Sequence, residues 1–281
     1  MRFGVSTWMW TCPFTTGDVI LLQKVAKMGF RAVEIPLEVD DQFDVAEVAT
    51  AVRDLDLRCS AVAIMTDARD PIHPDPQIQQ NGLAYLRDAV DVLSALGGGP
   101  IVGAAYTAAG RVYPAGPDQR KREFDLAVKH MRQAAEYAGD RGVVIAIEPL
   151  NRFESSFMSK TEIAVELVSA VDHPAIGVNL DTFHINIEER SFGETIERVG
   201  RKLYHLHACE NDRGRPGSGH VPWSEVAGAL RRIGYDRTVV IESFAPELEP
   251  IASAARIWQP FDRDMDAFAC DGLAFLERLF T

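Results

Sequence analysis

Cysteine is scarce in this sequence, and its few occurrences lie far apart. The chain has 281 residues and four cysteines, Cys12, Cys59, Cys209 and Cys270, with no C-x-x-C pair among them. A structural zinc site needs closely spaced ligand pairs, and a disulfide scaffold needs a denser cysteine framework. The sequence therefore argues against both.

Long apolar runs and an excess of basic residues are missing as well. No stretch reaches the ~18 apolar residues that span a bilayer, and the start, MRFGVSTWMW, lacks the basic and apolar regions of a secretory signal. Lys and Arg number 29 against 41 Asp and Glu, which gives a net charge of −12. Nucleic-acid binding needs a basic face that neutralises phosphates. We therefore expect a cytoplasmic protein that binds neither nucleic acid nor a membrane.

Short apolar runs alternate with amphipathic stretches along the chain. Because continuous apolar strands that alternate with helices indicate a parallel sheet covered by helices, eight such units in 281 residues predict a single (β/α)8 TIM barrel domain over residues 1–281. No G-x-G-x-x-G turn follows the first strand, and no linker divides the chain. The predicted strands cover residues 3–7, 32–35, 58–64, 100–103, 143–148, 176–181, 203–207 and 238–242. The predicted helices lie near 18–28, 44–56, 78–96, 119–139, 161–171, 192–199, 223–233 and 265–280.

Acidic and histidine side chains stand where the predicted strands end, and the C-terminal strand ends of such a barrel carry the active site. Strand two ends near Glu34, and the last four strands end at Glu148, Asp181, His207 and Glu242. Any one of these acids can be a solvated loop residue or a helix cap. Converging acids repel one another unless a cation neutralises them or they share protons. The last four residues form a hard, oxygen-rich set suited to Mn²⁺, Mg²⁺ or Co²⁺, so we expect them to bind a metal ion.

Other polar residues near these ends have less specific roles. His205 faces the same side of its strand as the histidine at the strand end, and we expect it to be hydrogen bonded one layer deeper. His130 falls in a helical stretch, and we expect it at the surface. The glycine-rich segment after strand seven can fold closely over a ligand. Its Arg213 and Arg215 suit an oxygen-rich ligand, so a phosphorylated substrate stays open.

Three segments carry a family signature. They read EPLNRFE at 148–154, LDTFHINIEE at 180–189 and HLHACENDR at 205–213. Together they resemble the ketose 3-epimerases, the D-tagatose and D-psicose (D-allulose) 3-epimerase group of the xylose-isomerase-like barrels. The segments at 27–35, 216–223 and 233–242 continue the likeness, which is most specific between residues 148 and 242.

The resemblance assigns roles to seven residues. It implies that one divalent metal, usually manganese or cobalt, is held by Glu148, Asp181, His207 and Glu242. It further implies that the sugar oxygens contact Glu154, His184 and Arg213. Glu148 and Glu242 would also form the acid–base pair, and the protein would be a homodimer or homotetramer.

The implied reaction inverts C3 of a free ketose of the D-tagatose, D-psicose/D-fructose or L-ribulose type. The C3 proton is weakly acidic because it lies alpha to the C2 carbonyl, and a metal ion would polarise that carbonyl and stabilise the enediolate. Inversion needs one carboxylate to remove the proton and a second to return one on the opposite face. An aldose–ketose isomerase that uses the same site is the main alternative. An abasic-site endonuclease would need several metals and a basic face, and a sugar-binding barrel without chemistry would not need both glutamates.

Two segments depart from the family pattern. Where family members carry an aromatic-rich stretch after strand one, this chain reads STWMWTCP at 6–13, and after strand four it reads GAAYTAAGR at 103–111 without a Trp-Pro. These positions would contact the far end of the substrate. The preferred sugar therefore stays open, while the chemical core is complete.

Overall fold

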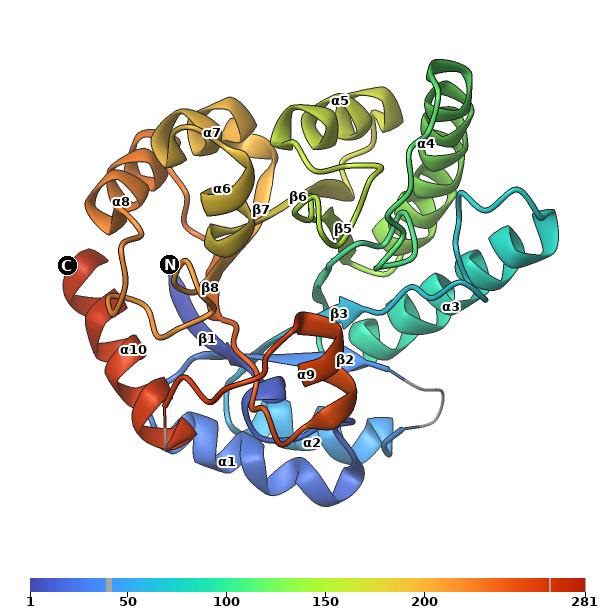
Figure 1. The fold of residues 1–281 in the computed structure, drawn as a ribbon. Coiled ribbons are helices and arrows are strands. Elements are labelled where there is room, and N and C mark those ends of the chain that lie inside the picture. Colours follow the sequence, from blue (N-terminus) through green and yellow to red (C-terminus); the bar gives the residue numbers. More distant parts are fainter. Residues whose placement is uncertain (39–41, 263, 281) are drawn as a thin grey trace.

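Eight parallel strands close into a barrel in chain order, β1 to β8, with β8 paired to β1. The computed structural model describes residues 1–38, 42–262 and 264–280. The prediction of a (β/α)8 TIM barrel is confirmed, and Figure 1 looks along the barrel with the helices around it. The strands are β1 (Arg2–Ser6), β2 (Ala32–Leu37), β3 (Arg58–Ala63), β4 (Gly99–Val102), β5 (Val143–Ile147), β6 (Ile176–Asp181), β7 (Leu203–Ala208) and β8 (Thr238–Ile241).

Helices follow the strands and cover the outside of the barrel. The sequence pattern did not predict two of them, α6 and α9, which are each seven residues long. The helices are α1 (Val19–Lys27), α2 (Val45–Asp54), α3 (Pro76–Ala95), α4 (Pro117–Gly139), α5 (Thr161–Val171), α6 (Thr182–Glu188), α7 (Phe192–Val199), α8 (Trp223–Arg232), α9 (Glu249–Ala255) and α10 (Met265–Phe280). None of the helices in the described ranges is long and apolar enough to cross a membrane.

Local signals explain where several helices begin. The side chains of Asp44 and Asp75 accept backbone N–H groups of Glu47 and Gln77 and so cap α2 and α3. α3 and α4 each have a proline in the first turn, where its missing N–H costs no hydrogen bond. The strands supply the buried inner layer: every residue of β2 and β6 is buried.

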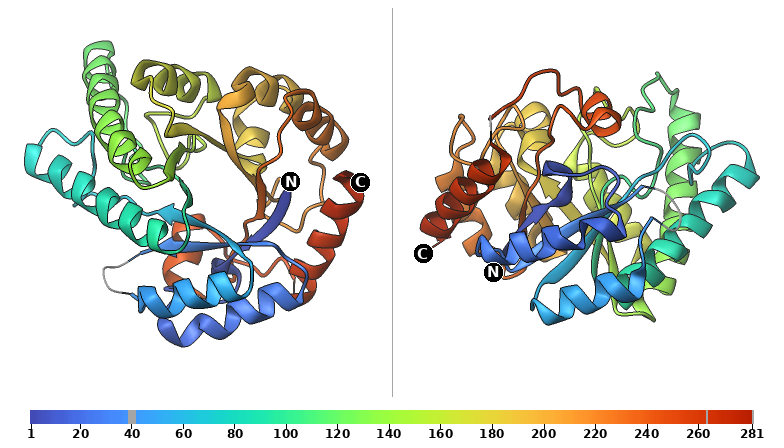
Figure 2. Two further views of the ribbon diagram at one scale, coloured as in Figure 1. Left: turned by 180° about the vertical axis from the view of Figure 1, so that it is seen from behind. Right: turned by 90° about the horizontal axis from the view of Figure 1, so that it is seen from below.

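The connections that follow the strands form one end of the barrel. In the side view of Figure 2, α9 lies at the end of the barrel away from the two termini. An apolar cluster there joins Trp8 from the turn after β1, Phe244 from the segment after β8, and Ala252 of α9. This packing covers one part of the mouth of the barrel with apolar side chains.

Two expectations about single residues are wrong. β2 does not end near Glu34, because its pairing with β3 continues to Leu37, opposite Ala63. Glu34 therefore lies inside the barrel, below the mouth. His130 is fully buried on α4, and its Nδ1 lies 2.6 Å from the carbonyl oxygen of Pro71.

Candidate metal centre and active site

The four expected metal ligands lie at the mouth of the barrel and are at most 5% exposed. Asp181 is the last residue of β6, His207 lies in β7, and Glu148 and Glu242 directly follow β5 and β8. His207 Nδ1 lies 3.3 Å from Glu148 Oε1 and 3.6 Å from Glu242 Oε1. Ligand atoms of Glu148, Asp181 and His207 lie within 4.8 Å of one another. Four strands thus bring three carboxylates and one imidazole to one place.

Backbone hydrogen bonds fix the position of Glu148. Its N–H donates to the carbonyl of Gly103 (3.1 Å), and its carbonyl accepts from the hydroxyl of Tyr106 (2.8 Å). Gly103 turns the chain after β4 at φ +91°, a conformation that side chains other than glycine rarely adopt. The segment after β4 therefore holds the glutamate on the neighbouring strand.

Asp181 is held at the junction of β6 and α6. Its Oδ1 accepts from the backbone N–H of Phe183 (2.8 Å), which caps α6, and from the thiol of Cys209 (3.2 Å). Its Oδ2 accepts from Arg213 Nη1, which also donates to Glu242 Oε2 at 2.7 Å. One guanidinium nitrogen thus bridges two buried carboxylates from β6 and β8.

The buried charges shift one another's titration. Burial raises the pKa of Glu242 to about 8, and repulsion from Asp181 and Glu148 adds to the rise. Burial would also raise the pKa of Asp181, but the charges of Arg213, His184 and His207 and the hydrogen bond from the Phe183 N–H together outweigh it and lower the pKa to about 2. Burial would lower the pKa of His207, yet the surrounding carboxylates, that of Glu242 first, raise it well above its ordinary value. The cluster is acidic enough to attract a cation.

The segment after β7 places Arg213 over the site. Arg213 has φ +71°, an uncommon backbone conformation for a residue with a side chain. The buried carboxylate of Glu210 accepts the backbone N–H groups of Gly217 and Val221 and the Nε1–H of Trp223, at 2.6 to 3.0 Å. Glu210 thereby folds this segment around itself. Arg215 instead faces α10, 3.8 Å from Asp271, so it does not join Arg213 in the site.

His184 on α6 faces the cluster. Its Nδ1 accepts the backbone N–H of Asn151 at 3.2 Å, and its Nε2 lies 3.5 Å from Arg213 Nη2. His184 Nε2 lies 3.9 Å from Asp181 Oδ2 and 4.0 Å from Glu148 Oε1. Glu154 is half-buried, and its Oε1 accepts from Asn151 Nδ2 at 2.7 Å. The N-R-F-E stretch therefore contacts both α6 and the site.

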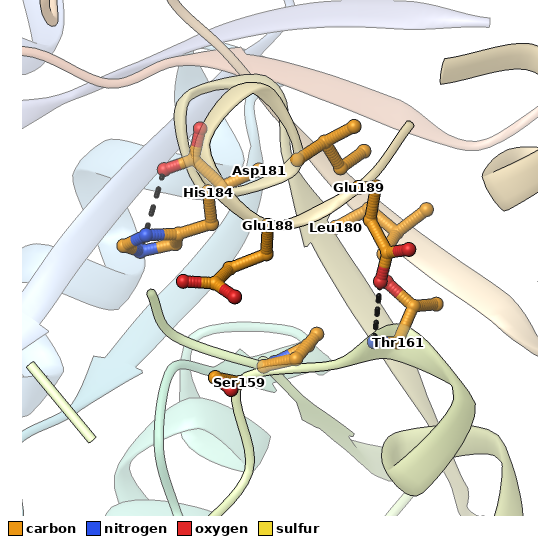
Figure 3. A pocket seen from close by; sticks show the side chains of 9 residues that line it. Ser159, Thr161, Leu180, Asp181, His184, Glu188 and Glu189 are labelled. Atoms are coloured by element: carbon orange, nitrogen blue, oxygen red, sulfur yellow. Dashed lines mark hydrogen bonds and ion pairs between the residues drawn. The ribbon is translucent and has the colours of Figure 1, made fainter. Parts of the chain in front are cut away.

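A small pocket beside the cluster separates α6 from the segment after β5 (Figure 3). Asp181 and His184 line its inner side, and Glu188 and Ser159 face it as well. The buried carboxylate of Glu188 accepts the backbone N–H and the guanidinium of Arg152 at 2.8 to 3.1 Å. α6 thus anchors the segment that carries the N-R-F-E stretch.

A second group of potential ligands lies one layer deeper. Glu34, His205 and His207 also offer one ligand atom each within 4.8 Å, and all three are fully buried. His205 Nε2 lies 3.1 Å from Glu34 Oε2, so His205 lies deeper in the barrel as expected, but neither of its ring nitrogens makes a hydrogen bond within the described part of the chain. Sequence reasoning missed the roles of Glu34, Asn151 and Glu210. The one sequence feature that could have indicated a role for Glu34 is that it is a carboxylate within the apolar run of β2.

The upper cluster has the chemistry of a divalent cation site. Carboxylate and imidazole ligands suit hard and borderline divalent ions, and three acids that converge in a buried place need a positive charge. Arg213 supplies one positive charge to the cluster, through Asp181 and Glu242. Glu148, Asp181, His207 and Glu242 can therefore hold one metal ion.

Comparisons with known proteins identify the family of the chain. The family model described as Xylose isomerase-like TIM barrel matches residues 22–260. The L-ribulose 3-epimerase of Methylomonas sp. (strain DH-1) is 33% identical over 100% of this chain and 98% of its own.

Two solved structures have the same fold at similar identity. A D-allulose 3-epimerase from Methylomonas sp. in complex with D-allulose has a TM-score of 0.92 at 29% identity, over 99% of this chain and 96% of its own. The D-psicose 3-epimerase with D-tagatose from Clostridium cellulolyticum H10 has a TM-score of 0.91 at 31% identity, over 100% and 99%. The chain belongs to the xylose isomerase-like TIM barrel family and, within it, to the ketose 3-epimerases.

Proposed function

We propose that this chain is a metal-dependent enzyme that inverts C3 of a free ketose. One observation carries the proposal: carboxylates from β5 and β8, strands separated by two others, approach one nitrogen of His207 at 3.3 and 3.6 Å. Inversion of a carbon centre needs two such acid–base groups. The relatives are named as epimerases of L-ribulose, D-psicose and D-allulose, which favours epimerisation over aldose–ketose isomerisation. Within the family range we propose a substrate of the D-tagatose, D-psicose/D-fructose or L-ribulose type.

The proposed ligands of one divalent cation are Glu148, Asp181, His207 and Glu242. Mn²⁺ suits this set of three carboxylates and an imidazole, as do Co²⁺ and Mg²⁺. Bound there, the cation supplies Lewis-acid stabilisation of negative charge on the sugar oxygens. The burial of all four side chains supports the proposal, because few waters then compete for the ligand positions.

In the proposed reaction, Glu148 and Glu242 move the proton. One carboxylate removes the C3 hydrogen, whose acidity comes from the C2 carbonyl beside it, and the resulting enediolate is planar at C3. The other carboxylate, now as the acid, returns a proton to the opposite face. The direction of the reaction decides which glutamate is the base.

Glu154, His184 and Arg213 are proposed to bind the sugar. His184 presents its Nε2 to the site, because Asn151 occupies Nδ1. Arg213 presents donors beside Asp181 and Glu242 and stacks on Phe183, with its guanidinium carbon 4.2 Å from the ring centre. These groups can orient the hydroxyls of a ketose against the two glutamates.

We further propose that residues 1–281 form one domain in a cytoplasmic homodimer or homotetramer that binds no nucleic acid. Phe153 is 73% exposed beside the site, and the exposed Val112 and Tyr113 lie on the segment that pairs with its own. Exposed apolar side chains on neighbouring segments favour contact with another protein surface. The net charge of −12 supports the absence of nucleic-acid binding.

A substrate panel tests the proposed function. The metal-loaded enzyme is assayed against free and phosphorylated ketoses, the products are separated by chromatography, and kcat/KM ranks the substrates. We expect C3 epimers of free ketoses, and loss of turnover in both Glu148→Gln and Glu242→Gln. An aldose product without any C3 epimer would overturn the proposal, as would near-normal turnover in either variant.

A further inference from the structure

The carboxylate of Glu34 contacts the ring nitrogen of His207 that is turned away from the proposed metal site. His207 Nε2 lies 3.2 Å from Glu34 Oε2 and 3.1 Å from Oε1, while Nδ1 of the same ring faces Glu148 and Glu242. The two nitrogens therefore have different partners. β2 and β7 are not neighbours in the barrel, so the Glu34 side chain reaches His207 through the barrel interior.

The position of this carboxylate is itself fixed. The hydroxyl of Ser60, opposite Glu34 in the register of β2 and β3, donates to Oε2 at 2.9 Å. Glu34 and His207 are fully buried, and Ser60 is 3% exposed. In such a place the local dielectric is low and few waters compete, so the hydrogen bond between ring and carboxylate is stronger than it would be in water.

We propose that Glu34 is a positioning residue of the metal centre. Its carboxylate can only accept a hydrogen bond, so it takes the Nε2 hydrogen of His207 and leaves the Nδ1 lone pair as a ligand for the divalent cation. The proposal rests on the proposed metal site. It does not depend on which sugar is the substrate.

The chain offers a clear test variant and a matched control. Glu34→Gln keeps the shape of the side chain but adds an NH₂ group, which can donate to Nε2 and move the ring hydrogen to Nδ1, where the cation should bind. Glu123→Gln removes another buried carboxylate, one that pairs with Arg111 at 2.6 Å outside the site. The control therefore separates an effect on the metal from a general loss of a buried charge.

The experiment measures the binding of Mn²⁺ to metal-stripped protein by calorimetry and chelator competition, without sugar. We expect one ion per chain, a dissociation constant about 10- to 100-fold higher in Glu34→Gln, and no change in Glu123→Gln. The visible absorption spectrum of the Co²⁺-loaded protein should also change in Glu34→Gln and not in the control. Circular dichroism checks that each variant is folded.

Several outcomes would overturn the proposal. If folded Glu34→Gln binds Mn²⁺ with an affinity within about twofold of the parent, the proposal is wrong. It is also wrong if the parent binds two ions per chain and this variant loses one of them, since Glu34 would then be a ligand. If Glu34→Gln does not fold, Ser60→Ala decides: weaker Mn²⁺ binding supports the proposal and unchanged binding overturns it. A different outcome separates the two proposals. If Mn²⁺ binding is weaker in Glu34→Gln but the parent epimerises no ketose, the proposed function is wrong and the role of Glu34 still holds.

Discussion

Removal of the Arg213 charge should destabilise the protein strongly when no metal is bound. In Arg213→Met, Asp181 Oδ2 and Glu242 Oε2 both lose their contact with the guanidinium. The side chains of these two acids are 0% and 6% exposed, so water cannot replace the lost partner. Removing one partner from a buried ion pair costs about 3–5 kcal/mol. At about 2–4 °C per kcal/mol for a domain of this size, we expect Tm to fall by about 6–20 °C.

Thermal melts of metal-stripped and Mn²⁺-saturated protein check this expectation. The fall in Tm should be smaller with Mn²⁺, because the cation takes over part of the neutralisation. Arg141→Met is the control: Arg141 pairs with Asp91 at 2.6 Å, but both side chains are at least 34% exposed, so the cost should stay within about 1 kcal/mol. An equal fall in Tm with and without Mn²⁺ would refute the reasoning.

The cost should also depend on pH. The pKa of Glu242 is raised from 4.5 to about 8 in the folded chain. An acid whose pKa is higher in the folded than in the unfolded state contributes stability at low pH and loses it as the pH rises through the folded value. Without Arg213 this pKa rises further. The destabilisation of metal-free Arg213→Met should therefore be larger at pH 8 than at pH 5, and the opposite trend would contradict this electrostatic account.

Two further predictions concern the segment after β7 and the exposed patch. Glu210→Gln should lower kcat/KM about 10- to 100-fold, because the segment that Glu210 holds would displace Arg213. The Mn²⁺ affinity should stay unchanged, because Glu210 is not a proposed ligand. Steady-state kinetics with a metal titration checks both expectations, and unchanged kinetics would contradict the first. Phe153→Asp should shift the oligomer towards smaller species in size-exclusion chromatography with light scattering, whereas Ile20→Asp, at a side chain that is 62% exposed on α1, should not. Equal behaviour of these two variants would place the interface elsewhere.

The barrel and its cluster of candidate metal ligands could be predicted because both follow from strand order. Parallel strands end at the same edge of a barrel, so Glu148, Asp181, His207 and Glu242 had to converge once the strands were placed. For every strand except β2 the last residue could be placed to within about one position, and that was sufficient for a cluster at the mouth.

The deeper layer could not be predicted from the same pattern. Glu34 stands between apolar residues of β2, and an error of two residues in the end of that strand moved it from the interior to the mouth. The partners of Glu210 are backbone N–H groups of an irregular segment, which leave no periodic signal. α6 was missed because it is only seven residues long and begins directly after Asp181, the last residue of β6, which is also its N-cap.

The position of the transferred hydrogen tests the central claim most directly. The metal-loaded enzyme is incubated with a ketose in D₂O, and the products are followed by NMR. The account predicts the C3 epimer of the ketose with deuterium at C3, and neither product nor exchange in Glu148→Gln or Glu242→Gln. An aldose product, or deuterium at C1 of the ketose with none at C3, would contradict it.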